Sequence, residues 1–189
     1  MVNLNEFKLN FKNLEIPKEL IGLVNFQNSI DDDENFSDQF YIGRDYSDKS
    51  GISGYSDNDE FTSSIIEFAM ADGSGSSYAF WIRNGNRNLN EAPILAFGSE
   101  GGIHIVAKDI KELLQILTFD VEPSTGWEEL YFYKDEDDYE PSDKIVEYKK
   151  WALENFSIKS TDDADEIVND AQEIYEEEFQ NWLKKYYDQ

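Results

Sequence analysis

The sequence predicts an α+β fold: a mostly antiparallel mixed sheet of about four to six strands, flanking helices and a C-terminal helical extension. Between residues 61 and 107, runs rich in β-branched and aromatic residues are separated by glycine turns, as in strands joined by hairpins. From residue 109 onwards, apolar residues recur every three or four positions, as on one face of a helix. Strands that follow one another through short turns favour antiparallel pairing.

The segment 93–117 is the centre of the predicted fold. Residues 93–97 form an almost unbroken apolar run, which predicts a short strand buried on both faces near the middle of the sheet. The glycines of 98–102 tolerate positive φ and a β-branched run follows at 103–106, so we expect a tight hairpin. The next helix must lay one face on the sheet, and that face carries Ile110, Leu113, Leu114 and Leu117.

The N-terminal part is expected to frame this centre. Residues 1–15 alternate apolar and polar positions and predict either an edge strand or an extended arm. Pro17 predicts the first position of a helix. Short strands are predicted at 39–42 and 52–55, separated by an Asp/Ser/Gly-rich loop at 45–51.

A second hairpin is predicted directly before the centre. The second half of 61–71 predicts a strand, 72–76 a glycine turn, and 77–82 the returning strand. The alternation of the returning strand places Tyr78 and Phe80 on one face of the sheet and Trp81 near the other.

The C-terminal part changes character after Phe119. An edge strand is predicted at 130–133 and an acidic loop at 135–140, after which Ser142 is expected to cap a helix that ends near residue 156. Asp162 or Asp163 is expected to cap a second helix, whose apolar stripe needs a surface to bury it. We predict one α+β domain at residues 1–140 and a helical extension at 141–189 packed on the same core.

The net charge of the chain limits the classes of partner that it is expected to bind. With 16 Lys plus Arg against 41 Asp plus Glu, the formal net charge is -25. Nucleic acids and anionic membranes are bound chiefly through Lys and Arg, so we expect neither as a partner. A basic protein is the partner that this charge attracts fastest, although the acidity also serves solubility. There is no cysteine, no basic leader and no run of eighteen apolar residues, so a soluble cytoplasmic protein is expected.

The order of these motifs resembles the SUKH superfamily. The likeness covers residues 16–117 and rests on IIEFAMADGSGSSYAFWI and PILAFGSEGGIHIVAKDIKELLQIL, which match the glycine turn, the Pro-led strand and the leucine-rich helix of that group. Many members carry an Asp in the aromatic strand, where this chain has Phe80-Trp81-Ile82, so a role tied to that Asp does not carry over. The resemblance implies a non-enzymatic α+β protein without a cofactor. Bacterial members resemble immunity proteins that neutralise toxins, often nucleases, and fungal relatives are linked to cell-wall regulation.

Motifs for catalysis or metal binding are weak. His104 is the sole histidine and has no cysteine beside it, so a zinc site or a nucleophilic triad is not indicated, and a packing or surface role is expected. The turn 73–76 lacks the Lys-Ser/Thr of a phosphate-binding loop and precedes a strand, which favours a hairpin turn. The acidic runs lack the calcium-binding spacing of an EF-hand and are expected to be solvated loops. Trp81 and Trp127 are expected in the core, with exposed anchors as the alternative.

The function we expect is binding and neutralisation of a basic toxin domain through an acidic surface. The alternatives are a regulatory interaction module with an endogenous partner and, less favoured, a hydrolase that uses paired carboxylates. The sequence does not indicate an oligomeric state. The candidate partner-binding residues are Asp31, Asp32, Asp33, Glu34, Asp57, Asp59, Glu60, Trp127, Asp135, Glu136, Asp137 and Asp138.

Overall fold

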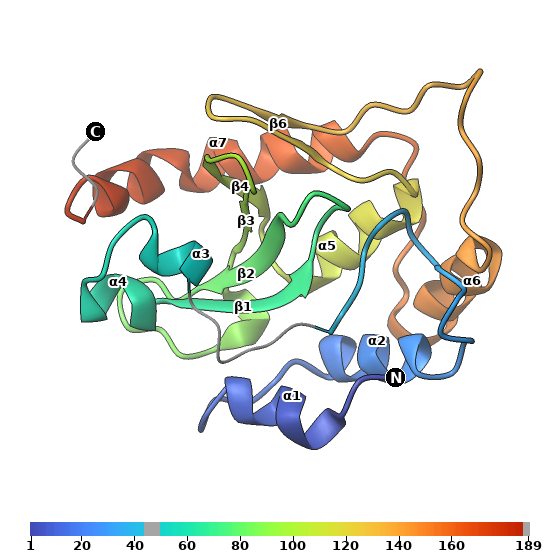
Figure 1. Cartoon of the computed structure of the whole chain (residues 1–189), viewed down its shortest axis with the longest axis horizontal. Helices are drawn as coiled ribbons and strands as arrows, with labels where there is room; N and C mark the ends of the chain where they lie inside the picture. Colours follow the sequence, from blue (N-terminus) through green and yellow to red (C-terminus); the bar gives the residue numbers. More distant parts are fainter. Residues whose placement is uncertain (44–49, 187–189) are drawn as a thin grey trace.

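The structure is a computed structural model, and it describes residues 1–43 and 50–186 (Figure 1). The helices are α1 (Leu4–Asn10), α2 (Lys18–Gln27), α3 (Ser50–Ser53), α4 (Asp59–Ser63), η1 (Leu89–Glu91), α5 (Ile110–Ile116), η2 (Leu117–Phe119), α6 (Ile145–Phe156) and α7 (Ala164–Leu183). The strands are β1 (Ile65–Met70), β2 (Ser77–Trp81), β3 (Ile94–Phe97), β4 (Ile103–Ala107), β5 (Ser124–Thr125) and β6 (Leu130–Tyr131). The predicted α+β class is confirmed.

The main sheet has the strand order β1-β2-β3-β4, and each of these pairs is antiparallel. β3 is therefore an interior strand, and all of its residues are buried, as the apolar run at 93–97 predicts. The turn between β3 and β4 is closed by a hydrogen bond from the Gly98 amide to the Gly102 carbonyl at 3.0 Å. β5 and β6 form a separate two-stranded sheet, so the predicted edge strand at 130–133 is shorter and does not join the main sheet.

Both faces of the main sheet are buried, by different helices. Tyr78 and Phe80 face the core that includes α1, α2, α5 and α6, whereas Trp81 faces a second core that includes α7. The Trp81 ring lies edge-on to the Phe179 ring of α7, with their centroids 5.1 Å apart. The predicted placement of these aromatics on opposite faces is confirmed. The apolar stripe of α7 finds its surface on this second face, where α7 contacts β4.

The helix starts at Asp109 and Asp163 are confirmed. Oδ1 of Asp109 accepts the amides of Lys111 and Glu112 at 2.8 and 3.1 Å, and Oδ1 of Asp163 accepts the Glu166 amide at 3.1 Å. Each carboxylate thus satisfies amides that the first helical turn leaves without a partner. The division at residue 140 stays a prediction.

The prediction of a strand or arm at 1–15 is wrong. Residues 4–10 form α1, which begins at Asn3, whose side chain accepts the amides of Asn5 and Glu6. Phe7 and Phe11 are buried four residues apart on one helix face, while Leu9 is 76% exposed, so the sequence alternation does not describe a sheet surface. The Asn10 side chain donates to the Glu67 carbonyl at 2.7 Å and thereby helps to cover the outer edge of β1.

Other local predictions are corrected as well. Within 39–42, the structure has an isolated bridge between Tyr41 and Met70 in place of a strand, and Ile52 belongs to α3. The predicted loop at 45–51 falls largely on residues 44–49, which lie outside the described residues. Ser142 does not cap α6 with its side chain; its carbonyl accepts the Ile145 amide at 3.2 Å, and α6 begins there.

The turn 72–76 is a hairpin turn closed on its own carboxylate. Oδ1 of Asp72 accepts the amides of Ser74, Gly75 and Ser76, each at 2.9 Å. These amides are the donors that a bound phosphate would use, so the predicted hairpin role is confirmed. Burial of Asp72 opposes its ionisation, but the hydrogen bonds from Ser76 and Ser74 outweigh burial and lower the pKa of Asp72 below 3.8.

We expect Asp72→Asn to lower the free energy of unfolding at pH 7 by about 1 to 2 kcal/mol, because charge-assisted hydrogen bonds to the turn are lost. The folded pKa of Asp72 is lowered, so this stabilisation is present above its ordinary value of 3.8 and is lost as the pH falls through the folded pKa. Urea unfolding of both proteins should therefore show a difference that shrinks below about pH 4. Asp137→Asn, at an exposed site, is the control, and a difference independent of pH would contradict the assignment.

Candidate protein-binding site

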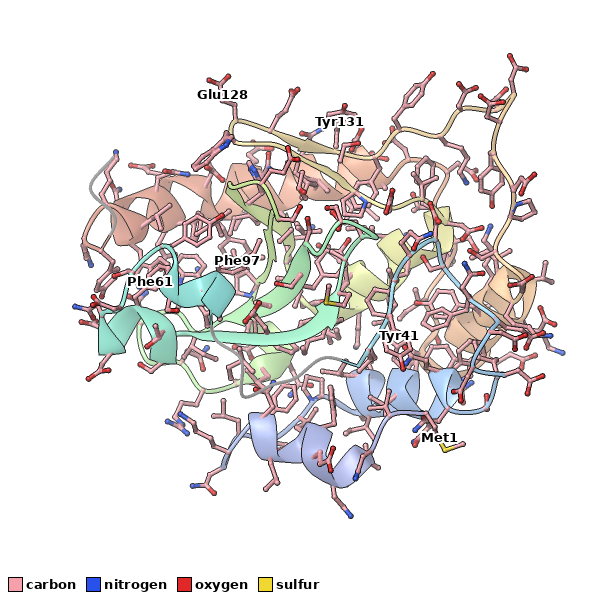
Figure 2. All side chains as sticks on the ribbon, in the orientation of Figure 1. Met1, Tyr41, Phe61, Phe97, Glu128 and Tyr131 are labelled. Carbon is pink, nitrogen blue, oxygen red and sulfur yellow. The ribbon has the colours of Figure 1, made fainter. Side chains whose placement is uncertain are left out.

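The hairpin of β5 and β6 presents large aromatic side chains to solvent. Trp127 is 66% exposed, Tyr131 43% and Tyr133 67%. Glu128 and Glu129 lie between them and are also exposed. Figure 2 shows Glu128 and Tyr131 on this hairpin, which lies over α7 at the top of the view. We call residues 124–133 the aromatic hairpin.

A groove of about 330 Å³ lies between the aromatic hairpin and α7. Glu128, Glu129, Asp165 and Glu176 contribute four carboxylates to its lining, and its described lining includes neither Lys nor Arg. His104 on β4 also lines the groove. We call it the acidic groove. Its composition favours a cationic side chain as its occupant.

The glycine turn between β3 and β4 allows the aromatic hairpin to approach closely. Gly101 and Gly102 have φ of +118° and +86°, which L side chains rarely adopt. A Cβ on Gly101 would collide with the Trp127 ring, and one on Gly102 would collide with the Gly126 carbonyl. The exposed Trp127 therefore has one side of its ring packed against backbone.

His104 also contacts the aromatic hairpin, at the turn between β5 and β6. Its Nε2 lies 2.7 Å from the Gly126 carbonyl, and a carbonyl only accepts, so Nε2 carries the proton and donates. The Ser76 and Thr125 hydroxyls add a contact of 2.9 Å to the β1–β2 turn. His104 thus has the packing role that the sequence predicts.

The buried carboxylate of Asp120 connects the chain before the aromatic hairpin with the chain after it. Asp120 has φ of +63° and is 1% exposed. Its Oδ1 accepts the Asp38 amide at 3.1 Å, and its Oδ2 accepts the Tyr139 hydroxyl at 2.5 Å and the Ser142 amide at 3.0 Å. Burial and this hydrogen bond to Asp120 raise the pKa of the Tyr139 hydroxyl well above 10.0. The hydroxyl therefore keeps its proton and remains a donor.

Lys134 and Asp165 fix the position of the chain at and directly after β6. The Lys134 ammonium bonds to the Phe119 carbonyl and lies 4.1 Å from the centre of the Tyr139 ring. Burial lowers the pKa of Lys134. The Phe132 amide donates to Oδ1 of Asp165 on α7 at 2.8 Å. These contacts fix the aromatic hairpin relative to α7, so the acidic groove is preformed.

The predicted site residues lie in three separate regions of the fold. Asp135, Glu136, Asp137 and Asp138 are exposed directly after the aromatic hairpin. Asp57, Asp59 and Glu60 lie at the start of α4. Asp31, Asp32, Asp33 and Glu34 follow α2, where Asp32 pairs with the Met1 amine at 2.8 Å and Glu34 with Lys144 at 3.0 Å. In Figure 1, α4 and the aromatic hairpin lie on different sides of the molecule.

Of the two tryptophans expected in the core, Trp81 is buried and Trp127 is not, so the core prediction is wrong for Trp127. Sequence reasoning missed Tyr131, Tyr133 and the carboxylates that line the acidic groove. One signal was available. Asp165, Asn169, Gln172 and Glu176 recur at helical spacing, and this polar stripe faces the aromatic hairpin.

The described residues contain neither a metal-binding cluster nor a membrane-spanning helix. No group of three or more His, Asp or Glu side chains there is placed to hold a metal ion. In the same residues, no helix combines the length and apolarity that crossing a membrane requires.

We expect Asp120→Asn to lower the free energy of unfolding by about 2 to 3 kcal/mol, because a buried charged acceptor with three donors is removed. Amide hydrogen exchange should accelerate across residues 121–142 more than in the main sheet. Asp138→Asn, on the same segment but exposed, is the matched control. Unchanged exchange in 121–142 would show that Asp120 does not anchor the hairpin.

In comparisons with known proteins, no protein-family model, no curated protein and no solved structure matches this chain. The SUKH resemblance therefore stays a prediction.

Proposed function

We propose that this chain is a non-enzymatic binding protein that docks onto a basic toxin domain, such as a nuclease, and neutralises it. The observation that supports the proposal best is the combination of the acidic groove with the exposed aromatics beside it. Protein interfaces concentrate their binding energy in a few residues, among which Trp, Tyr and Arg are enriched. The SUKH resemblance points in the same direction.

The charge distribution supports fast association with such a partner. At a formal net charge of -25, the chain attracts a cationic protein over distances of about a Debye length, roughly 8 to 10 Å. The acidic groove then offers Glu128, Glu129 and Glu176 as acceptors for Arg or Lys side chains at close range. A nuclease binds a phosphate backbone through such side chains, so an acidic protein competes for the same surface.

The aromatic hairpin supports a long-lived complex. Trp127 and Tyr131 offer flat rings on which an arginine guanidinium stacks. Because Asp120, His104 and Lys134 already fix the segment, little conformational entropy is lost when a partner binds. Preorganisation of this kind slows dissociation more than it changes association.

The alternative is a regulatory module that uses the same surface for an endogenous partner. The neighbouring gene distinguishes the two, because an immunity role requires a toxin-like domain beside it. A carboxylate hydrolase is less well supported, since one wall carboxylate of the groove, Asp165, is already an acceptor for the Phe132 amide.

The role of the acidic groove in association is tested by measuring how fast the triple variant Glu128→Gln, Glu129→Gln and Glu176→Gln binds the toxin domain encoded by the neighbouring gene. We expect the association rate at low salt to fall about tenfold, because local carboxylates steer the encounter. The matched control, Asp33→Asn, Asp57→Asn and Glu91→Gln, removes the same charge outside the groove and should change the rate much less. Equal effects of the two triple variants, measured by stopped-flow fluorescence, would refute a docking role for the groove.

The role of Trp127 as an anchor of the complex is tested with Trp127→Ala. We expect the binding free energy to weaken by about 2 kcal/mol, which raises the dissociation constant roughly 30-fold, mainly through faster dissociation. Tyr41→Ala removes an aromatic of 44% exposure away from the groove and is the control. Surface plasmon resonance gives both rate constants, and wild-type dissociation by Trp127→Ala would rule out this residue as an anchor.

A further inference from the structure

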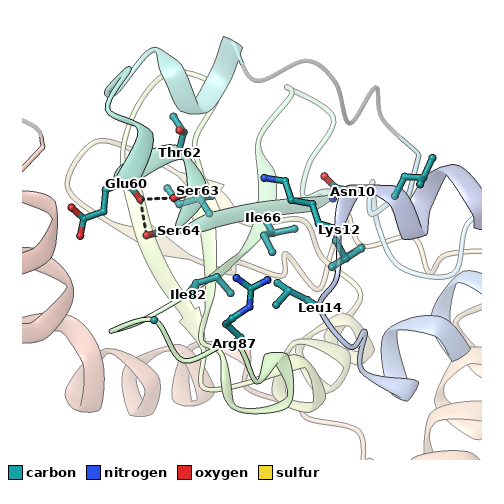
Figure 3. Close-up of a pocket in the computed structure, with 14 residues that line it drawn as sticks. Asn10, Lys12, Leu14, Glu60, Thr62, Ser63, Ser64, Ile66, Ile82 and Arg87 are labelled. Carbon is teal, nitrogen blue, oxygen red and sulfur yellow. Dashed lines mark hydrogen bonds between the residues drawn. The ribbon is translucent and has the colours of Figure 1, made fainter.

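A second cavity, of about 510 Å³, opens on the opposite side of the molecule from the aromatic hairpin. Its walls come from α1 and the residues that follow it, from α4, from the outer edge of β1, and from the loop after β2 (Figure 3). In Figure 1, α1 lies at the bottom and the aromatic hairpin at the top. The volume falls in the range of small-molecule sites, about 300 to 1,000 Å³.

One part of this cavity is apolar. Phe11, Leu14, Ile66 and Ile82 line it, and Phe11 is 1% exposed. Figure 3 shows the side chains of Leu14, Ile66 and Ile82 close together in its middle. This part suits the hydrocarbon body of a ligand, which gains about 25 cal/mol for each Å² of apolar surface removed from water.

The charged side chains that point into the cavity are cationic. Lys12 and Arg87 enter from two different walls, and both are directed into the cavity in Figure 3. Neither forms an ion pair with any residue that the structure describes.

The one carboxylate on the rim is engaged elsewhere. Glu60 lines the cavity, but in Figure 3 its carboxylate points away from it. Burial and a hydrogen bond to Glu60 raise the pKa of the Tyr186 hydroxyl, which places this carboxylate next to the C-terminal segment. The Ser63 and Ser64 hydroxyls donate to the Glu60 carbonyl at 3.3 and 2.7 Å. The positive charge of Lys12 and Arg87 is therefore not neutralised from within the cavity.

Backbone geometry sets the points from which the exposed side chains of Lys12 and Arg87 leave the chain. Lys12 follows the end of α1 with φ of +54°, and its amide donates to the Leu9 carbonyl at 3.1 Å. Arg87 follows a tight turn in which Asn84 and Gly85 both have positive φ. Left-handed conformations at Lys12 and Asn84 are uncommon for residues other than glycine, so the direction of each chain segment is specific.

We propose that this cavity binds a small organic acid. The anionic head, a carboxylate, sulfonate or phosphate, lies between Lys12 and Arg87, and the apolar body contacts Leu14, Ile66 and Ile82. A nucleic acid or an anionic membrane would bring many charges against the acidic exterior, whereas a small anion meets chiefly the local field of the two cations. The proposal is independent of the docking role of the acidic groove.

The test uses 8-anilinonaphthalene-1-sulfonate, an aromatic sulfonate whose fluorescence rises in apolar surroundings. We expect saturable binding by the wild-type protein and at least tenfold weaker binding by the double variant Lys12→Gln and Arg87→Gln. The control variant Lys8→Gln and Lys159→Gln removes the same charge from exposed sites outside the cavity and should bind like the wild type. N-phenyl-1-naphthylamine, which lacks the sulfonate, should bind the wild type and the first variant equally.

The location is checked independently of charge removal. Leu14→Asp places a carboxylate among the apolar side chains and should abolish sulfonate binding, whereas Val146→Asp on α6 adds the same charge at an exposed position and should not. The wild-type amide resonances of Leu14 and Gly85 should shift during the titration. Absence of saturable binding, equal loss in both double variants, or unshifted Leu14 and Gly85 resonances would overturn the proposal.

Discussion

Burial of the main sheet on both faces is the constraint on which the rest of the structure depends. β2 and β3 carry apolar side chains on both sides, so one layer of helices is not sufficient. α1, α2, α5 and α6 contribute to the core on one face, and α7 covers the other through Phe179 against Trp81. Because α7 must turn its apolar stripe inward, its opposite, acidic side remains available to the aromatic hairpin and to solvent.

This arrangement places acidic and basic side chains at different sites on the surface. Four carboxylates line the groove between α7 and the aromatic hairpin, while Lys12 and Arg87 form a local cationic site on the opposite side. The two proposed sites would take ligands of opposite charge, and the main sheet lies between them. An anionic small molecule and a basic protein would therefore not compete for the same surface, and the proposals for the two sites succeed or fail separately.

The sequence predicts the sheet well because its signals are local. The glycine turns at 72–76 and 98–102 and the short apolar runs beside them define β1 to β4 without distant information. α1 was not predictable from alternation, since contacts of Phe7 and Phe11 with the core decide its conformation. The acidic groove brings together His104, Glu128 and α7, and the cationic cavity brings together Lys12 and Arg87. Such sites depend on tertiary structure, so composition indicated an acidic binder but not its face.

In the proposed complex, the aromatic hairpin and the acidic side of α7 dock onto a basic protein. Hydrogen–deuterium exchange of this chain, free and bound to the toxin domain of the neighbouring gene, tests it most directly. We expect new protection at residues 124–133 and 165–176, with exchange in α1 and α4 unchanged. Protection concentrated at 31–34 or at α4, with the aromatic hairpin exchanging as in the free protein, would contradict it.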